Sequence, residues 1–172
     1  MSLNRNLIMG LSIIAILAMS RLIPHPPNFT PILGMAFFAG AVFDKKVFAY
    51  IITIFAMLLS DLFLGFHAGM FVIYFSLCLC VLIGTYMSSR LSFISGIIGI
   101  SCGVLLFYLI TNLAVWYGSG MYTKNMSGLI ECYIMGLPFL QNTFFSSILY
   151  GMAALGLYQL ANKYLNFRPK NI

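Results

Sequence analysis

Long apolar stretches separated by short polar segments dominate this chain. A transmembrane helix needs about 20 apolar residues to cross about 30 Å of hydrocarbon. Five stretches come near that length, at residues 7–23, 46–66, 70–87, 95–116 and 138–161. A sixth, residues 31–43, reaches only about 20 Å at roughly 1.5 Å per residue, so it predicts a short buried span or a re-entrant helix. The pattern predicts an all-α integral membrane protein.

Composition supports the same class. Of 172 residues, 62% are hydrophobic and 7% are charged, with a mean hydropathy of +1.01. Soluble domains are about 45–50% apolar and about 25% charged. These values exclude an ordinary soluble enzyme, a disordered chain and a nucleic-acid binder. No linker, charge block or repeat divides the sequence, so residues 1–172 are expected to form a single transmembrane domain.

The net charge of +6 is interpreted as topology, because cytoplasmic loops of membrane proteins are rich in Lys and Arg. Six spans with a cytoplasmic N-terminus place two basic residues outside, Arg21 and Lys124, and seven inside. Five spans with an external N-terminus exchange Arg21 for Arg5 and give the same bias. Charge counting leaves open the side of the loop at residues 24–30. A third possibility is that the first stretch is a cleaved signal peptide.

Small residues and a capping signal mark the short sixth stretch. Thr30 is expected to cap a helix whose first turn takes Pro31. Gly34 and Gly40 allow close approach of neighbouring backbones. The residues of the pairs Gly99/Gly103 and Ser147/Gly151 are four apart, which is the helix-packing spacing, and serve packing within the bundle or docking of another membrane subunit. We expect a short helix buried among the others.

Polar residues gather in the outer half of the six-span arrangement. This asymmetry predicts a polar pocket open to the outside. The candidate substrate-binding residues are Arg21, His25, Asn28, Asp61, His67, Asn112, Trp116, Glu131 and Asn142.

Asp61 lies near the end of an apolar helix, where burial and the negative end of the helix dipole both oppose its charge. Arg21 is the expected partner, in a pair that either fixes helix packing or belongs to the ligand site. His25, His67, Asp61 and Glu131 come from separate segments without metal-binding spacing, so we predict no metal site and no cofactor.

The remaining candidates each have a structural alternative. The rigid segment at residues 24–28 forms either a wall of the site or a stiff connector. Trp116 is either part of an interfacial aromatic belt or a stacking platform, whereas Asn112, one turn deeper, is the better pocket candidate. Glu131 is placed in a short interfacial helix at residues 127–136, capped by Ser127, where it belongs either to the site or to a solvated helix face.

Four motifs carry a resemblance to a known family. They are Arg21 to Pro31 (RLIPHPPNFTP), Ser60-Asp61 with Gly65-Phe66-His67, Thr111-Asn112 with Trp116, and Leu137-Pro138-Phe139 with Asn142-Thr143. Together they resemble a family of small bacterial inner-membrane proteins described as transport proteins. That family is similar to the substrate-binding S components of energy-coupling-factor (ECF) transporters.

The resemblance implies a six-helix bundle with a short second helix and both termini in the cytoplasm. It also implies a multi-pass protein of the bacterial inner membrane that binds a vitamin-like micronutrient from outside. S components work with a membrane coupling subunit and two ATPases, and this chain has no nucleotide-binding motif of its own. Their Ala-x-x-x-Ala contact motif is absent from the first stretch.

Three functions follow, in order of preference. The first is a substrate-binding subunit for uptake of a small molecule, which is not an enzyme. The second is an accessory or structural subunit of a membrane complex. The third is a membrane-embedded metal-dependent enzyme, which the lack of a nucleophile motif disfavours.

Overall fold

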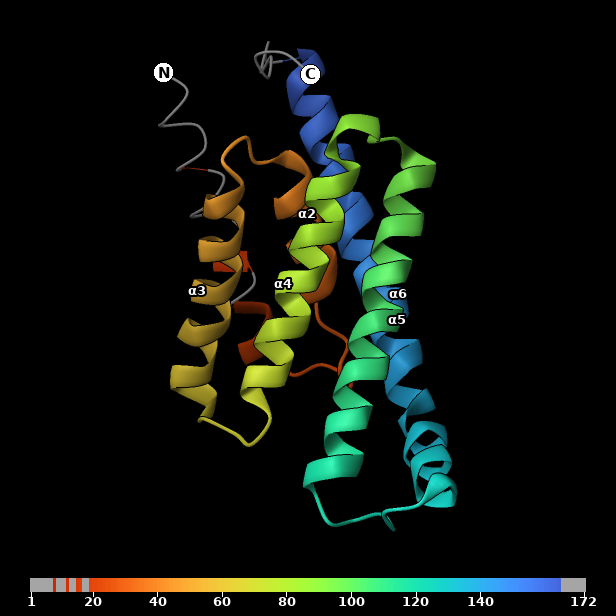
Figure 1. Cartoon of the computed structure of the whole chain (residues 1–172). Coiled ribbons are helices and arrows are strands. Elements are labelled where there is room, and N and C mark those ends of the chain that lie inside the picture. The colour runs from red at the N-terminus through yellow and green to blue at the C-terminus, as the bar shows by residue number, and fades with distance from the viewer. Residues whose placement is uncertain (1–7, 9–11, 13–14, 17–18, 165–172) are drawn as a thin grey trace.

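A computed structural model describes residues 8, 12, 15, 16 and 19–164 of the chain (Figure 1). Within them, residues 8, 12, 15, 16 and 19–22 are helical, in the stretch where the first span is predicted. The signal-peptide alternative concerns residues that lie mostly outside this described part. The helices that follow are α2 (Ile32–Val42), α3 (Lys46–Leu64), α4 (Met70–Met87), the 3-10 turn η1 (Ser88–Arg90), α5 (Phe93–Gly118) and α6 (Met126–Tyr164).

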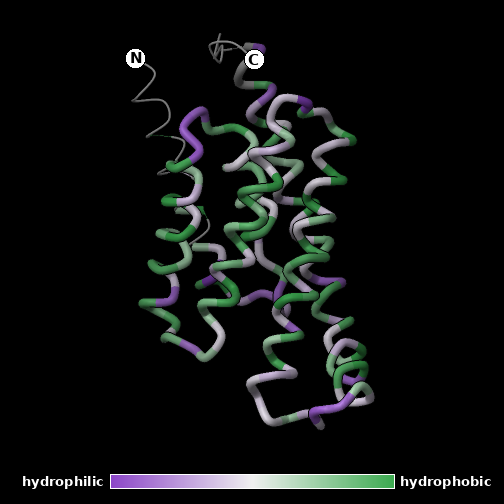
Figure 2. The backbone as a smooth tube through the Cα atoms, in the orientation of Figure 1, coloured by the Kyte–Doolittle hydropathy of each residue, from purple (hydrophilic) through white to green (hydrophobic). Residues whose placement is uncertain are grey.

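The predicted helical membrane bundle is confirmed. In the described part of the chain there are no strands, and four helices are long and apolar enough to cross a membrane. Many of their large apolar side chains are exposed, as expected of surfaces that face hydrocarbon. Figure 2 shows the same pattern: hydrophobic helices lie between more hydrophilic connections at the two ends.

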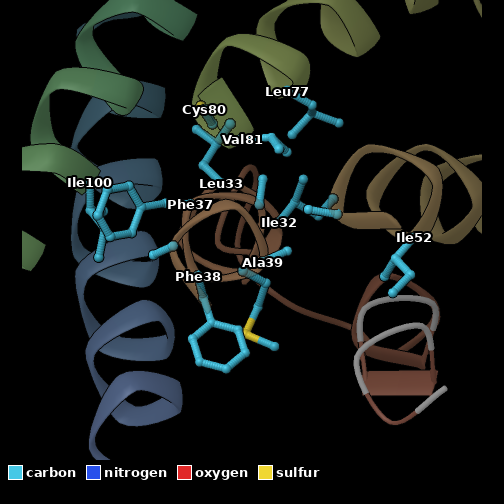
Figure 3. Packing of buried hydrophobic residues seen from close by; sticks show 14 of the residues in the cluster. Ile32, Leu33, Phe37, Phe38, Ala39, Ile52, Leu77, Cys80, Val81 and Ile100 are labelled. Carbon is cyan, nitrogen blue, oxygen red and sulfur yellow. The ribbon is translucent and has the colours of Figure 1, made fainter. Parts of the chain in front are cut away.

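The short helix α2 is the centre of the bundle. It has 11 residues, ten of them buried, and it packs against α3, α4, α5 and α6. Figure 3 shows Phe37 extending toward Ile100 of α5 and Leu33 lying near Val81 of α4. A helix that is apolar on every side is expected in such a position. The prediction of a short buried helix is therefore confirmed.

Glycines let the neighbouring backbones approach α2 closely. A Cβ atom at Gly34 would overlap the Ser147 carbonyl oxygen and lie 2.9 Å from the Gly151 nitrogen of α6. A Cβ at Gly84 of α4 would overlap the Phe37 carbonyl oxygen. The predicted pair Ser147/Gly151 thus packs against α2 within the bundle.

Two predicted helix starts are wrong. Pro31, and not Thr30, is the N-cap of α2, and no side-chain hydrogen bond caps that helix. At the start of α6 the cap is Asn125, whose Oδ1 accepts from the Gly128 N–H at 2.9 Å, in place of Ser127. The Asn125 side chain competes better for this position because it precedes the first helical residue, whereas Ser127 already lies inside the helix.

The separate helix expected at residues 127–136 is also wrong. α6 runs unbroken for 39 residues, and Pro138 lies inside it. Proline is tolerated within membrane helices because neighbouring groups can satisfy the freed backbone carbonyl. At 1.5 Å per residue α6 is about 58 Å long, well beyond the thickness of the hydrocarbon layer. Figure 1 shows the α5–α6 hairpin extending past the turn between α3 and α4.

The two ends of the bundle differ in charge. One end carries the α2–α3 connection, the α4–α5 connection and the end of α6 and, among the described residues, holds one acidic residue, Asp44, and four basic ones, Lys45, Lys46, Arg90 and Lys163. The opposite end carries the α3–α4 and α5–α6 turns, with Lys124 and Glu131. The positive-inside rule assigns the first end to the cytoplasm. We call the opposite end the outer end.

The loop at residues 24–30 lies in the outer half. Arg21, just before it, contacts Asp61, which is three residues from the outer end of α3. In Figure 1 the loop lies nearer the middle of the bundle than the two outer turns do. This position favours the six-span arrangement over the five-span one. Because α2 is too short to span the membrane, the loop reaches inward to meet it.

Candidate functional site

A cavity of about 230 Å³ lies where the inward loop meets the outer halves of the helices. Its polar lining comes from Arg21, His25, Asn28, Thr30 and Thr143. Its apolar lining comes from α2, α3, α4 and α5, through Ile32, Leu33, Met57, Leu64, Ile73 and Phe107. His25, Asn28 and Leu64 are exposed, so the cavity reaches the protein surface at the outer end.

The predicted pair of Arg21 and Asp61 is confirmed. Arg21 Nη1 lies 2.5 Å from Asp61 Oδ1 and donates at 2.5 Å to Ser60 Oγ. The Asp61 side chain is 0% exposed, and its second oxygen accepts from the Tyr74 hydroxyl at 2.6 Å. A buried carboxylate needs such partners because desolvation is otherwise costly. Asp61 is therefore held behind the cavity wall, while Arg21 lies in that wall.

A tight turn shapes the loop that carries His25 and Asn28. The Phe29 N–H donates to the Pro26 carbonyl at 3.0 Å, and Asn28 has a φ of 60°. Proline at the second position and a residue with positive φ at the third are typical of a type II turn. Asparagine tolerates this left-handed conformation better than most residues do. The turn presents the Asn28 side chain to the cavity.

The loop is fastened to α6 at two points. Asn142 Nδ2 donates to the Pro27 carbonyl at 3.0 Å, and the Phe29 ring meets the Tyr150 ring edge-on with 6.3 Å between centroids. The candidate residue Asn142 thus contacts the loop and is absent from the cavity lining. The segment at residues 24–28 contributes His25 and Asn28 to the cavity lining.

His67 lies outside the cavity lining. It is exposed in the α3–α4 turn, where its Nδ1 is 3.1 Å from the Ala68 carbonyl oxygen. Among the residues that the structure describes, no three His, Cys, Asp or Glu side chains are grouped to hold a metal ion. His25, His67, Asp61 and Glu131 are therefore not assembled into one centre.

Asn112 faces the α5–α6 interface. A Cβ at Gly136 would lie 2.5 Å from Asn112 Oδ1, and Asn112 Nδ2 donates to the Tyr108 carbonyl at 2.9 Å. The Cys132 thiol donates to the Asn112 carbonyl at 3.3 Å. Asn112 is predicted to line the pocket because it lies one turn deeper in the membrane than Trp116. The rotation of α5 about its axis instead directs the Asn112 side chain toward α6.

Trp116 and Glu131 lie in the extended α5–α6 hairpin. The Trp116 indole N–H donates to the Thr123 carbonyl at 2.9 Å, and Lys124 Nζ lies 5.6 Å from the Trp116 ring centroid. Lys124 also donates to the Trp116 and Tyr117 carbonyls, which compensates the negative end of α5. Glu131 is exposed on α6. Neither candidate lines the cavity.

Sequence reasoning left Thr30 and Thr143 out of the site, although both line the cavity. Both were visible as polar residues of the outer half. Thr143 Oγ1 donates to the Phe139 carbonyl, so its oxygen keeps acceptor capacity toward the cavity.

A family model described as "Family of unknown function (DUF6580)" matches residues 1–169. The chain belongs to this family. No curated protein and no solved structure matches the chain. The family describes almost the whole sequence without assigning it a ligand, so the functional argument rests on the cavity.

Proposed function

We propose that this protein binds a small polar or amphipathic nutrient at its outer end and serves its uptake. The observation that carries the proposal is the cavity lined by Arg21, His25 and Asn28. Polar groups converging on a partly apolar concavity are the usual composition of a small-molecule site. Its volume of about 230 Å³ lies below the ~300–1,000 Å³ typical of drug-sized ligands, which favours a small molecule.

The cost of the buried charges also supports a binding role. Ionisable groups within a membrane are rare and usually functional, because they are expensive to place there. The Arg21–Asp61 pair positions one cation in the cavity wall, where Arg21 also donates to Ser60. Arg21 and Tyr74 together satisfy both carboxylate oxygens of Asp61. A bundle that required packing alone could place apolar side chains here at equal or lower cost.

The resemblance to S components extends the proposal. On that basis the protein is a substrate-binding subunit of the bacterial inner membrane, with both termini cytoplasmic, and takes up a vitamin-like micronutrient. It would require an ECF coupling subunit and ATPases for active transport. It would bind its cargo without transforming it, so it is not an enzyme.

Two histidines provide a matched test. His25 and His67 are both exposed, and each places Nδ1 near the carbonyl oxygen of the next residue, at 2.9 and 3.1 Å. Only His25 lines the cavity. The proteins carrying His25→Ala and His67→Ala are purified in detergent beside the parent, and small molecules released by heat are identified by mass spectrometry.

The proposal expects one discrete compound in the parent and in His67→Ala, with at least a several-fold depletion in His25→Ala. The melting temperatures of all three proteins should agree. Equal amounts of the compound in both variants would place its site elsewhere. Absence of any compound, together with a fixed protein partner in all three preparations, would favour the accessory-subunit function.

A further inference from the structure

Two further hollows lie beside the cavity, between α4 and α5 on the side that faces the lipid. Ile73 lines both the cavity and a neighbouring hollow of about 250 Å³. Val72 and Ala114 line that hollow and also a shallower one of about 540 Å³ farther out. The shared residues make these spaces adjacent. We call the two outer hollows together the α4–α5 groove.

The groove exists because the two helices separate toward their outer ends. About midway along α4 they touch: a Cβ at Gly103 of α5 would lie 3.0 Å from Cys80 Sγ of α4. Figure 1 shows them diverging toward the outer turns. The far rim of the groove includes Phe71, Phe75 and Leu113, which are 82%, 58% and 47% exposed. These positions belong to helices long and apolar enough to span a membrane, so this rim is expected to face hydrocarbon. The other edge of the groove, at Ala68, Gly69, Gly118 and Ser119, lies at the outer turns.

The cavity and the groove have different chemistry. The groove is lined almost entirely by apolar side chains and carries no charged residue. Among the residues that the structure describes, Arg21 is the only permanently charged side chain in the cavity lining, and no carboxylate lines the cavity. In the described part of the chain, Arg21 Nη1 donates to Asp61, Ser60 and the Met57 sulfur, which leaves Nε and Nη2 as donors for a ligand. Guanidinium groups bind carboxylates well through two such donors.

We propose that the protein binds a single-chain amphiphile with a carboxylate head, which enters from the membrane between α4 and α5. The head would lie at Arg21, Asn28 and Thr30, and the apolar tail would follow the groove past Ile73 and Val72. This inference rests on the proposed binding function and adds the class of ligand and its route.

The test measures equilibrium binding of labelled butyrate and decanoate to the full chain in lipid nanodiscs, with empty nanodiscs subtracted. Ala114→Trp fills the groove from α5. Ala153→Trp, at an exposed position of α6, is the matched control. Decanol replaces decanoate to test the head group.

The expected result is saturable decanoate binding at least tenfold tighter than that of butyrate, relative to free aqueous ligand, because burial of each CH₂ adds affinity. Ala114→Trp should weaken the binding of decanoate at least tenfold and change the affinity for butyrate by less than twofold. Ala153→Trp should change neither. Decanol should bind at least tenfold more weakly than decanoate.

A second measurement uses the unaltered protein and so avoids any folding defect of Ala114→Trp. Decanoate with a terminal diazirine should crosslink to groove residues of α4 and α5. Equal binding of butyrate and decanoate, or crosslinks confined to other helices, would overturn the groove as the binding path.

The two proposals can fail separately. If neither carboxylate binds while heat releases a different compound that depends on His25, the amphiphile inference is wrong and the binding function stands. If no compound is released and none binds, both are wrong.

Discussion

Arg21 Nη1 lies 2.5 Å from Asp61 Oδ1, and this contact joins the last turn before the inward loop to a fully buried carboxylate of α3. The two residues are 40 positions apart in the sequence. The pair fixes the start of the loop relative to α3 and places a cation in the cavity wall. Removing one partner leaves an uncompensated charge, whereas removing both leaves none.

The first prediction separates these two cases. Arg21→Met and Asp61→Leu alone should each destabilise the protein by about 3–5 kcal/mol, the usual cost of breaking a buried pair. The double variant should be more stable than either single variant, because no charge remains unpaired. Reversible unfolding in detergent measures this. Additive losses in the double variant would contradict it.

Tyr74→Phe is expected to have a smaller effect. It removes the hydroxyl that donates to Asp61 Oδ2 at 2.6 Å and leaves the aromatic ring unchanged. Hydrogen bonds to charged groups contribute about 1.5–3 kcal/mol. A stability loss in that range is expected by the same unfolding measurement. No loss would mean that the hydroxyl does not support the carboxylate.

Glycine substitutions test the central position of α2. Gly34→Ala and Gly84→Ala should each destabilise by about 1–3 kcal/mol, because a methyl group would meet backbone atoms that cannot withdraw. At Gly156 of α6 an added methyl group would meet no neighbouring helix or side chain within 4 Å, so Gly156→Ala should be neutral or stabilising by up to about 1 kcal/mol. Melting temperatures check this: they should fall for Gly34→Ala and Gly84→Ala and stay the same or rise for Gly156→Ala. Equal effects at all three positions would mean that close packing does not set the outcome.

The attachment of the loop can be tested without a ligand. Asn142→Ala removes the bond to the Pro27 carbonyl, which is worth about 0.5–1.5 kcal/mol. The Phe29 amide, bonded to Pro26, should then exchange its hydrogen about 2–10-fold faster. Gln141→Ala, at an exposed neighbouring position, is the control and should leave the exchange rate unchanged. If both variants exchange at the parental rate, the loop does not depend on α6.

Much of this architecture could be predicted from single residues in unusual surroundings. Asp61 inside an apolar stretch required a cation, and Arg21 was the available one. The small residues of the short stretch predicted a helix that others approach closely. Such inferences succeed because an unpaired charge or a missing Cβ carries a large energetic consequence wherever the helices lie.

Other features depend on how each helix is rotated and where it ends, which the position of a residue in the sequence does not reveal. Asn112 has the right depth for the cavity, but the rotation of α5 directs it to Gly136. Pro138 suggested a helix boundary, yet α6 continues through it because a membrane helix can accommodate proline. Trp116 is engaged by Lys124 in a hairpin that extends beyond the other outer turn. Helix rotation and length, set by packing against neighbours, decide which polar residues meet.

The most direct test of a ligand cavity open to the outside is cysteine labelling in intact cells. His25→Cys, His67→Cys and Ser89→Cys are made singly in a chain whose four native cysteines are serine. All three positions are exposed, but only residue 25 lines the cavity, and residue 89 lies at the opposite end of the bundle. A membrane-impermeant maleimide is applied with and without the compound recovered from the purified protein.

The cavity predicts labelling from outside at residues 25 and 67, with the compound slowing labelling at residue 25 alone. Residue 89 should be labelled only after lysis. Labelling of residue 25 only after lysis, or at a rate that the compound does not change, would contradict an outward-facing binding site.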